Sequence, residues 1–478
     1  MKKNYKSDKE NTIFTKNTFQ TRYLNYMQVN SKIFKAYDIR GIYGVDFDEQ
    51  TFYQIAQAYA KLVKPKGKVA VGMDARISSP ALKRAVISGL NDAGVSVMDI
   101  GLASTEMYYF AVGYYKLAGG IQVTASHNPK EWNGLKMVKK SVAPINFENG
   151  IGRIKSWIEA GWKNIKVKKP GKVRQKNVLD DFCRFANKFL KPAAAKRSLK
   201  IVFNPNFGYE GEVLKRFVKL AKPNWKIIGL NDKVDGTFPK GRPDPFVPEN
   251  RPEFCALVKS SRADLGVAWD ADADRVFFAA DGGTFLESYY TNHLLIKSLL
   301  AGKKRQKIIY DPRYAWALID AAKEMGAKPV LERVGHSYIK ARMRKEKVIF
   351  SGESSGHTYF QDFWYADSGL IPLLVMANLL AKEKKNLSEL VVPLFKKYFI
   401  SGEINSTVSD VGKVLARLES RYKTGKISHF DGLSVEFPEW RFNVRSSNTE
   451  PLLRLNLEAK SQKLMEEKKD EVLGLIRK

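Results

Sequence analysis

The chain has 478 residues, of which 44% are hydrophobic and 12% aromatic, a composition that excludes an intrinsically disordered protein and is typical of several folded domains. Lysine and arginine number 81 against 50 aspartates and glutamates, so the net charge is +31. This charge raises the question of nucleic-acid binding, but the lysines are scattered through every predicted helix without a zinc-finger, homeodomain or RNP motif, which favours small polyanionic substrates over DNA or RNA.

The start of the chain is polar and basic and lacks the apolar stretch of a secretory signal. We expect residues 1–30 to be a disordered extension, and Met27, just ahead of the ordered pattern, is a candidate for the true start of translation. The longest apolar run, Leu370 to Ala381, is shorter than the ~20 residues that cross a bilayer, which indicates a buried helix and no membrane partner. Only Cys183 and Cys255 are present, so a disulfide framework is excluded and a cytoplasmic location is expected.

From Ser31 onward, short apolar runs alternate with amphipathic stretches of helical period, which predicts an α/β fold with mixed, mostly parallel sheets. Three runs pass in the same way from an apolar strand into Asp or Asn and a turn, and they indicate three related α/β domains: Lys68 to Arg76, Lys200 to Gly208 and Lys307 to Ala315. A two-strand signal and a charged terminal helix predict a smaller C-terminal α+β domain. The expected domains are 31–172, 173–284, 285–395 and 396–478.

A serine follows the strand predicted at residues 119–125. Ser126 lies beside His127 and Asn128, and Pro129 blocks continuation of the strand. Because α/β sheets place their sites at the carboxyl ends of strands, Ser126 is a candidate nucleophile. Ser-His-Asn is also a common turn composition, and these residues alone favour an ordinary capped turn.

Three aspartates alternate after another apolar run, at Asp270, Asp272 and Asp274. Carboxylates crowded in this way repel one another unless a hard dication lies among them, and oxygen ligands suit Mg²⁺. An EF-hand is excluded because Arg275 stands where its sixth position needs glycine. A solvated acidic loop is the weaker alternative between two apolar runs. The sequence therefore predicts a Mg²⁺ site, with Arg275 available to neutralise substrate charge.

A glycine-bracketed loop, Ser351 to Phe360, has a composition suited to the hydroxyls of a sugar. It carries Glu353, Ser355 and His357, and His336 lies upstream. Loops rich in Gly and Ser are common, so this signal is weak by itself.

A last polar turn follows the second strand of the two-strand signal near the end of the chain. Its guanidinium, hydroxyl and amide groups suit the oxygens of a phosphate, although a hydrogen-bonded turn would have the same composition. Of five histidines in the chain, three fall in these stretches, which favours one composite site. The donors in the turn are Arg445, Ser447, Asn448 and Thr449.

These four motifs in this order resemble the α-D-phosphohexomutase superfamily, and the match runs from Phe34 to the end of the chain. The segments FKAYDIRGIYG, TASHNP, VGHSYIK, ADSGLIPLL and WRFNVRSSNTEPLLRLNLEA look most like those of bacterial members of the phosphomannomutase/phosphoglucomutase group. The resemblance implies three related α/β domains and a smaller mobile C-terminal domain around a central cleft. It also implies a phosphosugar substrate, a hexose 1,6-bisphosphate activator and a monomer or homodimer.

The resemblance also implies roles for individual residues. Ser126 would rest as phosphoserine and pass its phosphoryl group to the sugar, and the aspartate triplet together with Ser126 would hold Mg²⁺. His336 is the first candidate for the general acid/base and Arg313 the second. The remaining implied site residues are His127, Lys136 and Arg275 at the transferring phosphate, Glu353, Ser355 and His357 at the sugar, Arg445, Ser447, Asn448 and Thr449 at the distal phosphate, and Tyr37 and Arg40 in the cleft.

Two departures bear on the expected chemistry. Many relatives have Asp-Gly-Asp in the metal loop, whereas here Ala271 takes the glycine position, so it must lie at negative φ or be strained. The sugar loop has Ser354 after the glutamate, where several phosphomannomutases have methionine, and this leaves the preference between mannose and glucose open. The alternatives are therefore phosphoglucomutase or dual activity, less readily a glucosamine phosphate mutase, and, from other classes, a metal-dependent phosphatase or a nucleic-acid-binding protein.

Overall fold

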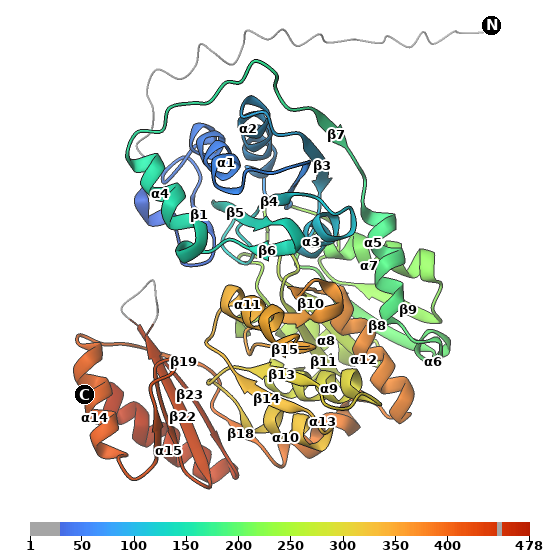
Figure 1. The fold of residues 1–478 in the computed structure, drawn as a ribbon. Helices are drawn as coiled ribbons and strands as arrows, with labels where there is room; N and C mark the ends of the chain where they lie inside the picture. The colour runs from blue at the N-terminus through green and yellow to red at the C-terminus, as the bar shows by residue number, and fades with distance from the viewer. Residues whose placement is uncertain (1–28, 447–451) are drawn as a thin grey trace, which may run out of the picture.

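The computed structural model describes residues 29–446 and 452–478, in which four sheets follow one another along the chain (Figure 1). The predicted extension lies outside the described residues except for Val29 and Asn30. The first three sheets mix parallel and antiparallel pairs, and the fourth is antiparallel throughout. The predicted fold class, three related α/β units followed by an α+β unit, is confirmed.

The first unit has a sheet in the order β1-β5-β4-β2-β3-β7, with β6 beside β5. Its strands are β1 Ile39–Ile42, β2 Val69–Met73, β3 Val97–Leu102, β4 Gly119–Val123, β5 Trp132–Lys139, β6 Ala143–Pro144 and β7 Val173–Gln175, and its helices are α1 Glu49–Val63, α2 Ser79–Asp92, α3 Thr105–Tyr114 and α4 Gly152–Glu159.

The second unit has the order β12-β11-β10-β8-β9 and the third the order β14-β13-β15-β16-β17. The second contains α5 Leu179–Ala186, α6 Pro192–Lys196, β8 Leu199–Asn204, α7 Glu210–Ala221, β9 Trp225–Gly229, α8 Pro252–Ser260, β10 Leu265–Trp269, β11 Val276–Ala280 and β12 Phe285–Leu286. The third contains α9 Ser288–Leu300, β13 Lys307–Tyr310, α10 Trp316–Glu324, β14 Lys328–Leu331, α11 His336–Glu346, β15 Phe350–Gly352, β16 Thr358–Phe360, β17 Ala366–Asp367, α12 Leu370–Glu383 and α13 Leu387–Phe395.

The three units share one topology. In each, a central strand (β2, β8 or β13) has a parallel neighbour on either side, and one neighbour (β4, β10 or β15) turns into an antiparallel hairpin. The serine loop, the aspartate loop and the sugar loop are the turns of these three equivalent hairpins. The repeated strand therefore places three of the predicted motifs at the same position of three related sheets.

The fourth unit has the order β18-β23-β22-β21-β20, with β19 also paired to β23. Its elements are β18 Phe399–Ile400, β19 Ile404–Thr407, α14 Val411–Arg421, β20 Lys426–Ser428, β21 Leu433–Glu436, β22 Trp440–Ser446, β23 Leu452–Ala459 and α15 Gln462–Ile476.

The buried apolar clusters connect the first three units with one another but leave the fourth unit with a separate core. One buried cluster runs through all of the first three units, from Ala70 to Tyr398, whereas the core of the fourth unit is made of its own residues, from Val414 to Ile476. The run predicted as a buried helix is α12, whose side chains are buried along most of its length. Within residues 29–446 and 452–478, no helix combines the length and the apolar character needed to cross a bilayer.

A pair of buried glutamates joins the first three units. Glu106 in the first turn of α3 and Glu210 at the start of α7 are both fully buried, and their carboxyl groups lie close enough to interact electrostatically. Glu106 also accepts hydrogen bonds from the N–H groups of Gly369 and Leu370, at 2.9 and 3.1 Å, and so caps α12. Two buried carboxyl groups side by side repel each other when both are ionised, and burial, followed by the charge of Glu106, raises the pKa of Glu210 well above its ordinary value.

We expect Glu210→Gln to raise the thermal stability of the protein, by an amount that grows with pH. The carboxyl of Glu210 has a raised pKa in the folded state, so its contribution is fully present below the unfolded value of 4.5 and is lost as pH rises toward the folded value. A glutamine has nearly the same shape and stays neutral at every pH. Thermal unfolding of both proteins between pH 5 and pH 9 measures the difference, with the partly exposed neighbour Glu212→Gln as control. A difference that stays constant with pH would contradict the raised pKa of Glu210.

Candidate functional site

Ser126 lies in the turn after β4 and is 1% exposed. Its φ is +51°, in the left-handed region, which is costly for a residue other than glycine and is typical of functional turns. The N–H of Ser126 donates to Thr124 Oγ1 at 2.9 Å, and this bond helps to hold the turn. The hydroxyl lies 3.2 Å from Nδ1 of His127. The backbone thus presents the hydroxyl in one fixed orientation.

Two arginines fasten the serine loop. Arg76, fully buried after β2, donates to the carbonyl oxygens of Ser126, Asn128, Pro129 and Trp132, at 2.5 to 3.1 Å. The predicted site residue Arg40 pairs with Asp38 at 2.8 Å and donates to Oδ1 of Asn128 at 2.7 Å and to the carbonyl of Ala125 at 3.3 Å. Sequence reasoning missed Arg76, although its place directly after a strand, in MDAR, was a usable signal.

The aspartate loop meets the serine loop. The Ser126 hydroxyl donates to Oδ2 of Asp270 at 2.5 Å and lies 3.5 Å from Oδ1 of Asp274. Asp272 accepts from the hydroxyls of Thr105 and Thr124 at 2.6 and 3.0 Å. The structure therefore brings the serine and all three aspartates together across two units. The two threonines were not predicted, because nothing in the local sequence marks them.

The three carboxylates are buried, and one oxygen of each lies within 4.8 Å of the others, close enough to hold a single ion. Burial and the two neighbouring aspartates raise the pKa of Asp270 well above its ordinary value. The ammonium of Lys136, on β5, contacts Asp272 at 2.6 Å and also Asp274. The positive charge of Lys136 therefore already lies among the carboxylates. Oδ1 of Asp272 has no hydrogen-bond partner among the described residues and is free to act as a metal ligand. This donor set fits Mg²⁺.

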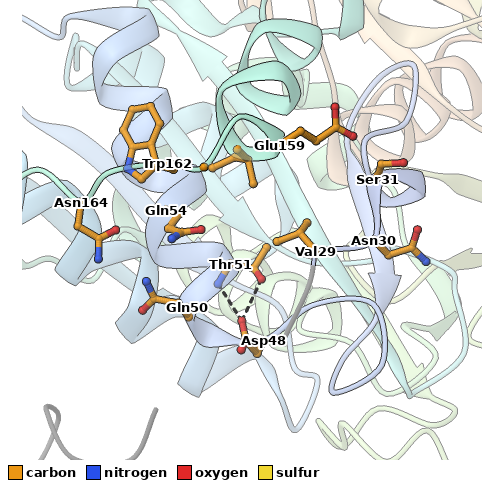
Figure 2. Close-up of a pocket in the computed structure, with 12 residues that line it drawn as sticks. Val29, Asn30, Ser31, Asp48, Gln50, Thr51, Gln54, Glu159, Trp162 and Asn164 are labelled. Atoms are coloured by element: carbon orange, nitrogen blue, oxygen red, sulfur yellow. Dashed lines mark hydrogen bonds between the residues drawn. The ribbon is translucent and has the colours of Figure 1, made fainter. Parts of the chain in front are cut away.

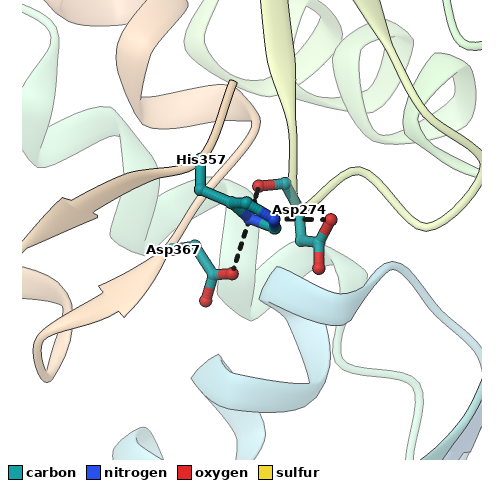
Figure 3. Close-up of side chains that lie close together, drawn as sticks. All are labelled: Asp274, His357 and Asp367. Atoms are coloured by element: carbon teal, nitrogen blue, oxygen red, sulfur yellow. Dashed lines mark hydrogen bonds and ion pairs between the residues drawn. The ribbon is translucent and has the colours of Figure 1, made fainter. Parts of the chain in front are cut away.

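Arg275 and His357 link the aspartate loop to the third unit. Nε of Arg275 lies 3.3 Å from Nε2 of His357, and Nδ1 of His357 lies 3.0 Å from the carbonyl oxygen of Asp274 and 3.3 Å from Asp367 (Figure 3). Lys340 pairs with the other oxygen of Asp367 at 2.5 Å. Asp274, His357 and Asp367 are close enough to hold a cation, but Lys340 and Lys136 already balance the two carboxylates. Asp367 orients His357, a role that the sequence did not indicate.

Glu353, in the turn after β15, is 3% exposed and is held from three directions. It accepts from the hydroxyl of Tyr359 at 2.5 Å, from the N–H of Gly335 at 3.3 Å and from Arg313 at 3.4 Å. Arg313 also forms a bidentate pair with Asp311, at 2.9 and 2.8 Å. The sugar-loop carboxylate is therefore fixed in orientation, and Arg313 is bound into the same network.

His336 begins α11 close to two other predicted residues. Its ring centroid lies 5.2 Å from that of Tyr37 and 6.5 Å from that of His357. Burial and then Lys340 lower the pKa of His336 well below its ordinary value, so the ring is neutral. Burial likewise raises the pKa of Tyr37 to about 12, and its hydroxyl donates to the carbonyl of Val334 at 3.2 Å. A neutral imidazole at this place can accept a proton.

The predicted distal-phosphate turn is described only in part. Arg445 lies near the end of β22, and burial followed by Arg313 lowers its pKa. Arg445 lies close enough to Arg313 and Tyr37 to interact electrostatically with both. Ser355 is half-buried in the turn after Glu353. The other predicted members of the turn, Ser447, Asn448 and Thr449, lie outside the described residues.

A cavity of about 800 Å³ lies elsewhere, on the first unit between α1 and α4 (Figure 2). Thr51 donates twice to Asp48, both at 2.9 Å, at one end of this cavity. None of the predicted site residues lines it, and we assign the candidate site to the converging hairpin turns instead. The residues lining the cavity include Asn30, Gln50, Gln54, Trp162 and Asn164.

Comparison with known proteins gives four consecutive matches. Models of the phosphoglucomutase/phosphomannomutase α/β/α domains I, II and III match residues 31–160, 180–283 and 287–398, and the model of the C-terminal domain matches residues 403–475. An Escherichia coli protein named phosphomannomutase is 40% identical over 452 residues, which are 93% of this chain and 99% of that protein. A Vibrio cholerae protein of the same name is 41% identical over 458 residues, 93% and 98% of the two chains.

A solved structure is also similar. The crystal structure of a phosphoglucomutase/phosphomannomutase family protein from Burkholderia thailandensis superposes with a TM-score of 0.83 at 29% identity. The superposition covers 94% of this chain and 97% of that one.

Proposed function

The chain belongs to the phosphoglucomutase/phosphomannomutase family, and we propose from this membership that it is a phosphomannomutase, which interconverts mannose 6-phosphate and mannose 1-phosphate. The observation that carries the proposal is the 2.5 Å contact between the Ser126 hydroxyl and Asp270, which joins the serine loop to the aspartate loop across two units. The names of the relatives from Escherichia coli and Vibrio cholerae support mannose over glucose. We place the activity in the cytoplasm, in a monomer or homodimer.

Ser126 would carry the phosphoryl group between the two ends of the sugar. In the first half-reaction the bond between Ser126 Oγ and phosphorus breaks, and a bond forms from phosphorus to a sugar hydroxyl oxygen, whose proton passes to a base. This yields a hexose 1,6-bisphosphate, which turns over and returns its other phosphoryl group to Ser126. A trace of the bisphosphate would keep the serine phosphorylated and so act as the activator.

Positive charge around the transferring phosphate would do most of the catalytic work, because phosphoryl transfer depends on positioning and charge neutralisation. Asp270, Asp272 and Asp274 would hold Mg²⁺, which supplies charge against the phosphate oxygens when bound. Lys136 lies beside the same carboxylates, and the backbone N–H of Arg275 donates to Asp270 at 3.2 Å, so Arg275 belongs to the same loop.

We propose His336 as the base, because its neutral ring can accept the sugar's proton. Arg313, the second candidate, is paired with Asp311 and Glu353, and these carboxylates raise its pKa although burial alone would lower it. Arg313 therefore stays charged and is better suited to fixing Glu353 than to moving a proton. Glu353 and Ser355 would bind the sugar hydroxyls, and Arg445 with Ser447, Asn448 and Thr449 the distal phosphate.

Parallel coupled assays with mannose 1-phosphate and glucose 1-phosphate test the substrate. With Mg²⁺ and a trace of the matching bisphosphate, we expect kcat/KM for mannose 1-phosphate to be at least about tenfold higher, the discrimination that one hydroxyl orientation can supply. Equal values would indicate a dual-specificity mutase, and the reverse order a phosphoglucomutase.

A further inference from the structure

The third and fourth units are joined by a buried ion pair that the site residues do not include. Glu458 on β23 and Arg441 on β22 stand opposite each other in the antiparallel register, and Nη1 of Arg441 lies 2.7 Å from the Glu458 carboxylate. Glu458 is 0% exposed and Arg441 5%. Removing two such charges from water is costly, and it is compensated only when every remaining polar atom is bonded.

Both side chains of the pair also bond to the third unit. Glu458 accepts from the hydroxyl of Tyr289 at 2.5 Å and from the N–H of Ala315 at 2.8 Å, with Trp316 N–H at 3.4 Å. The guanidinium of Arg441 donates to the carbonyl of Pro312 at 2.7 Å and to that of Arg313 at 3.4 Å. The pair therefore binds both N–H groups and carbonyl oxygens of the loop of residues 312–316, which connects β13 to α10.

This loop carries Arg313, whose side chain contacts Glu353 of the sugar loop. The Arg313 backbone is held by Arg441, while its own guanidinium is paired with Asp311 and reaches Glu353 at 3.4 Å. On the same strand as Arg441, four residues further along, lies Arg445 of the distal-phosphate turn. Residues four apart on a strand face the same side. One strand thus contacts the loop behind the sugar site and carries the phosphate-binding arginine.

The pair also lies where the chain passes between the two units. Glu458 is in register with Ile400 of β18, the first strand of the fourth unit, and the N–H of Ser401 donates to the carbonyl of Leu457 at 2.9 Å. A contact at this crossing stays in place while more distant parts of the fourth unit move, so it can fix the distance between the two binding sites.

We propose that Arg441 and Glu458 are positioning residues, which set the spacing between the sugar loop and the distal-phosphate arginine and thereby determine how tightly a phosphosugar binds. The inference rests on the proposed mutase function. Neither residue touches the reacting atoms, so their loss acts on substrate binding and leaves the phosphoserine machinery of the first two units in place.

Arg441→Lys is the sharpest test, because lysine keeps the charge opposite Glu458 but cannot make the guanidinium's bonds to both carbonyl oxygens. We expect KM for mannose 1-phosphate to rise about tenfold or more while kcat changes by less than about threefold. Glu458→Gln, which keeps hydrogen-bond acceptance but loses the charge, should raise KM in the same direction. Arg421→Lys is the matched control, since Arg421 pairs with Glu471 at 3.1 Å on the surface of the same unit.

The outcomes separate the two proposals. If the wild-type protein turns over mannose 1-phosphate and both variants keep its KM, the positioning role is wrong and the mutase function stands. If kcat falls with KM unchanged, or if Arg421→Lys raises KM as much, the role is likewise wrong. If the wild type converts neither sugar phosphate, the proposed function fails, and calorimetric binding of mannose 1-phosphate to wild type and Arg441→Lys then tests the positioning alone, with equal affinities overturning it.

Discussion

Ser126→Ala is expected to lower kcat for the mutase reaction by about 10⁴-fold or more, since it removes the atom that carries the phosphoryl group in both half-reactions. The side chain is buried between His127 and Asp270, so alanine removes one hydroxyl and little packing, and the variant should fold. The coupled assay measures the loss. Intact mass provides a second reading: the wild-type protein should gain ~80 Da when incubated with the bisphosphate, and the variant should not.

Ser156→Ala is the matched control, because this exposed serine on α4 makes only a local bond to the carbonyl of Gly152. It should retain full activity and the added mass. The variant also separates two reaction classes. A metal-dependent phosphatase that used the aspartate triplet alone would survive Ser126→Ala, so substantial remaining turnover of the sugar phosphate would refute the mutase mechanism.

Removal of divalent metal is expected to abolish turnover and to lower thermal stability. Asp270→Asn should also lose turnover, but without a loss of thermal stability in the metal-free protein. Chelation leaves three buried carboxylates facing one another with Lys136 as the nearest cation, so repulsion is relieved only in part. We expect added Mg²⁺ to raise the unfolding temperature of the wild type by about 1–2 °C, the shift that ~1–2 kcal/mol of binding linkage gives in a chain of this length.

Asp270→Asn removes one of the repelling charges while its amide oxygen can still accept from Ser126. The metal-free variant should therefore unfold at or above the temperature of the metal-free wild type, show almost no Mg²⁺-dependent shift, and lose at least about 100-fold in kcat. Asp362→Asn, at an exposed position of the third unit, controls for charge and should keep both the shift and the activity. A full Mg²⁺-dependent shift in Asp270→Asn would mean that the triplet is not the metal site.

The sequence predicted what depends on local pattern. The apolar runs placed β2, β8 and β13, and the polar residues after β4, β10 and β15 marked three turns that the structure brings to equivalent positions. Strand ends can be predicted because hydrophobic periodicity stops there. That Ser126 and Asp270 lie 2.5 Å apart required the further knowledge that related units pack against one another, which only the family resemblance supplied.

The supporting residues were not predictable in the same way. Arg76 and Thr105 act through contacts with loops 50 and 167 residues away. The position of Arg76 directly after a strand was a usable signal, but no local pattern distinguishes Thr105 from an ordinary helix-start residue. Arg313 was expected as a possible base, but its pairing with Asp311 and Glu353 depends on three-dimensional packing. Ala271, which takes the position of a glycine found in many relatives, lies outside the left-handed region of φ. The backbone strain in this loop lies instead at Ala273, with φ of +58°.

The self-contained core of the fourth unit has a consequence for heating. Because one apolar cluster connects the first three units and a separate cluster fills the fourth, we expect the fourth unit to unfold at a lower temperature than the other three. It is also the smaller body and buries less apolar surface. The serine loop and the aspartate loop then stay together after the fourth unit has unfolded, so loss of activity should precede unfolding of the other three units and be reversed by cooling.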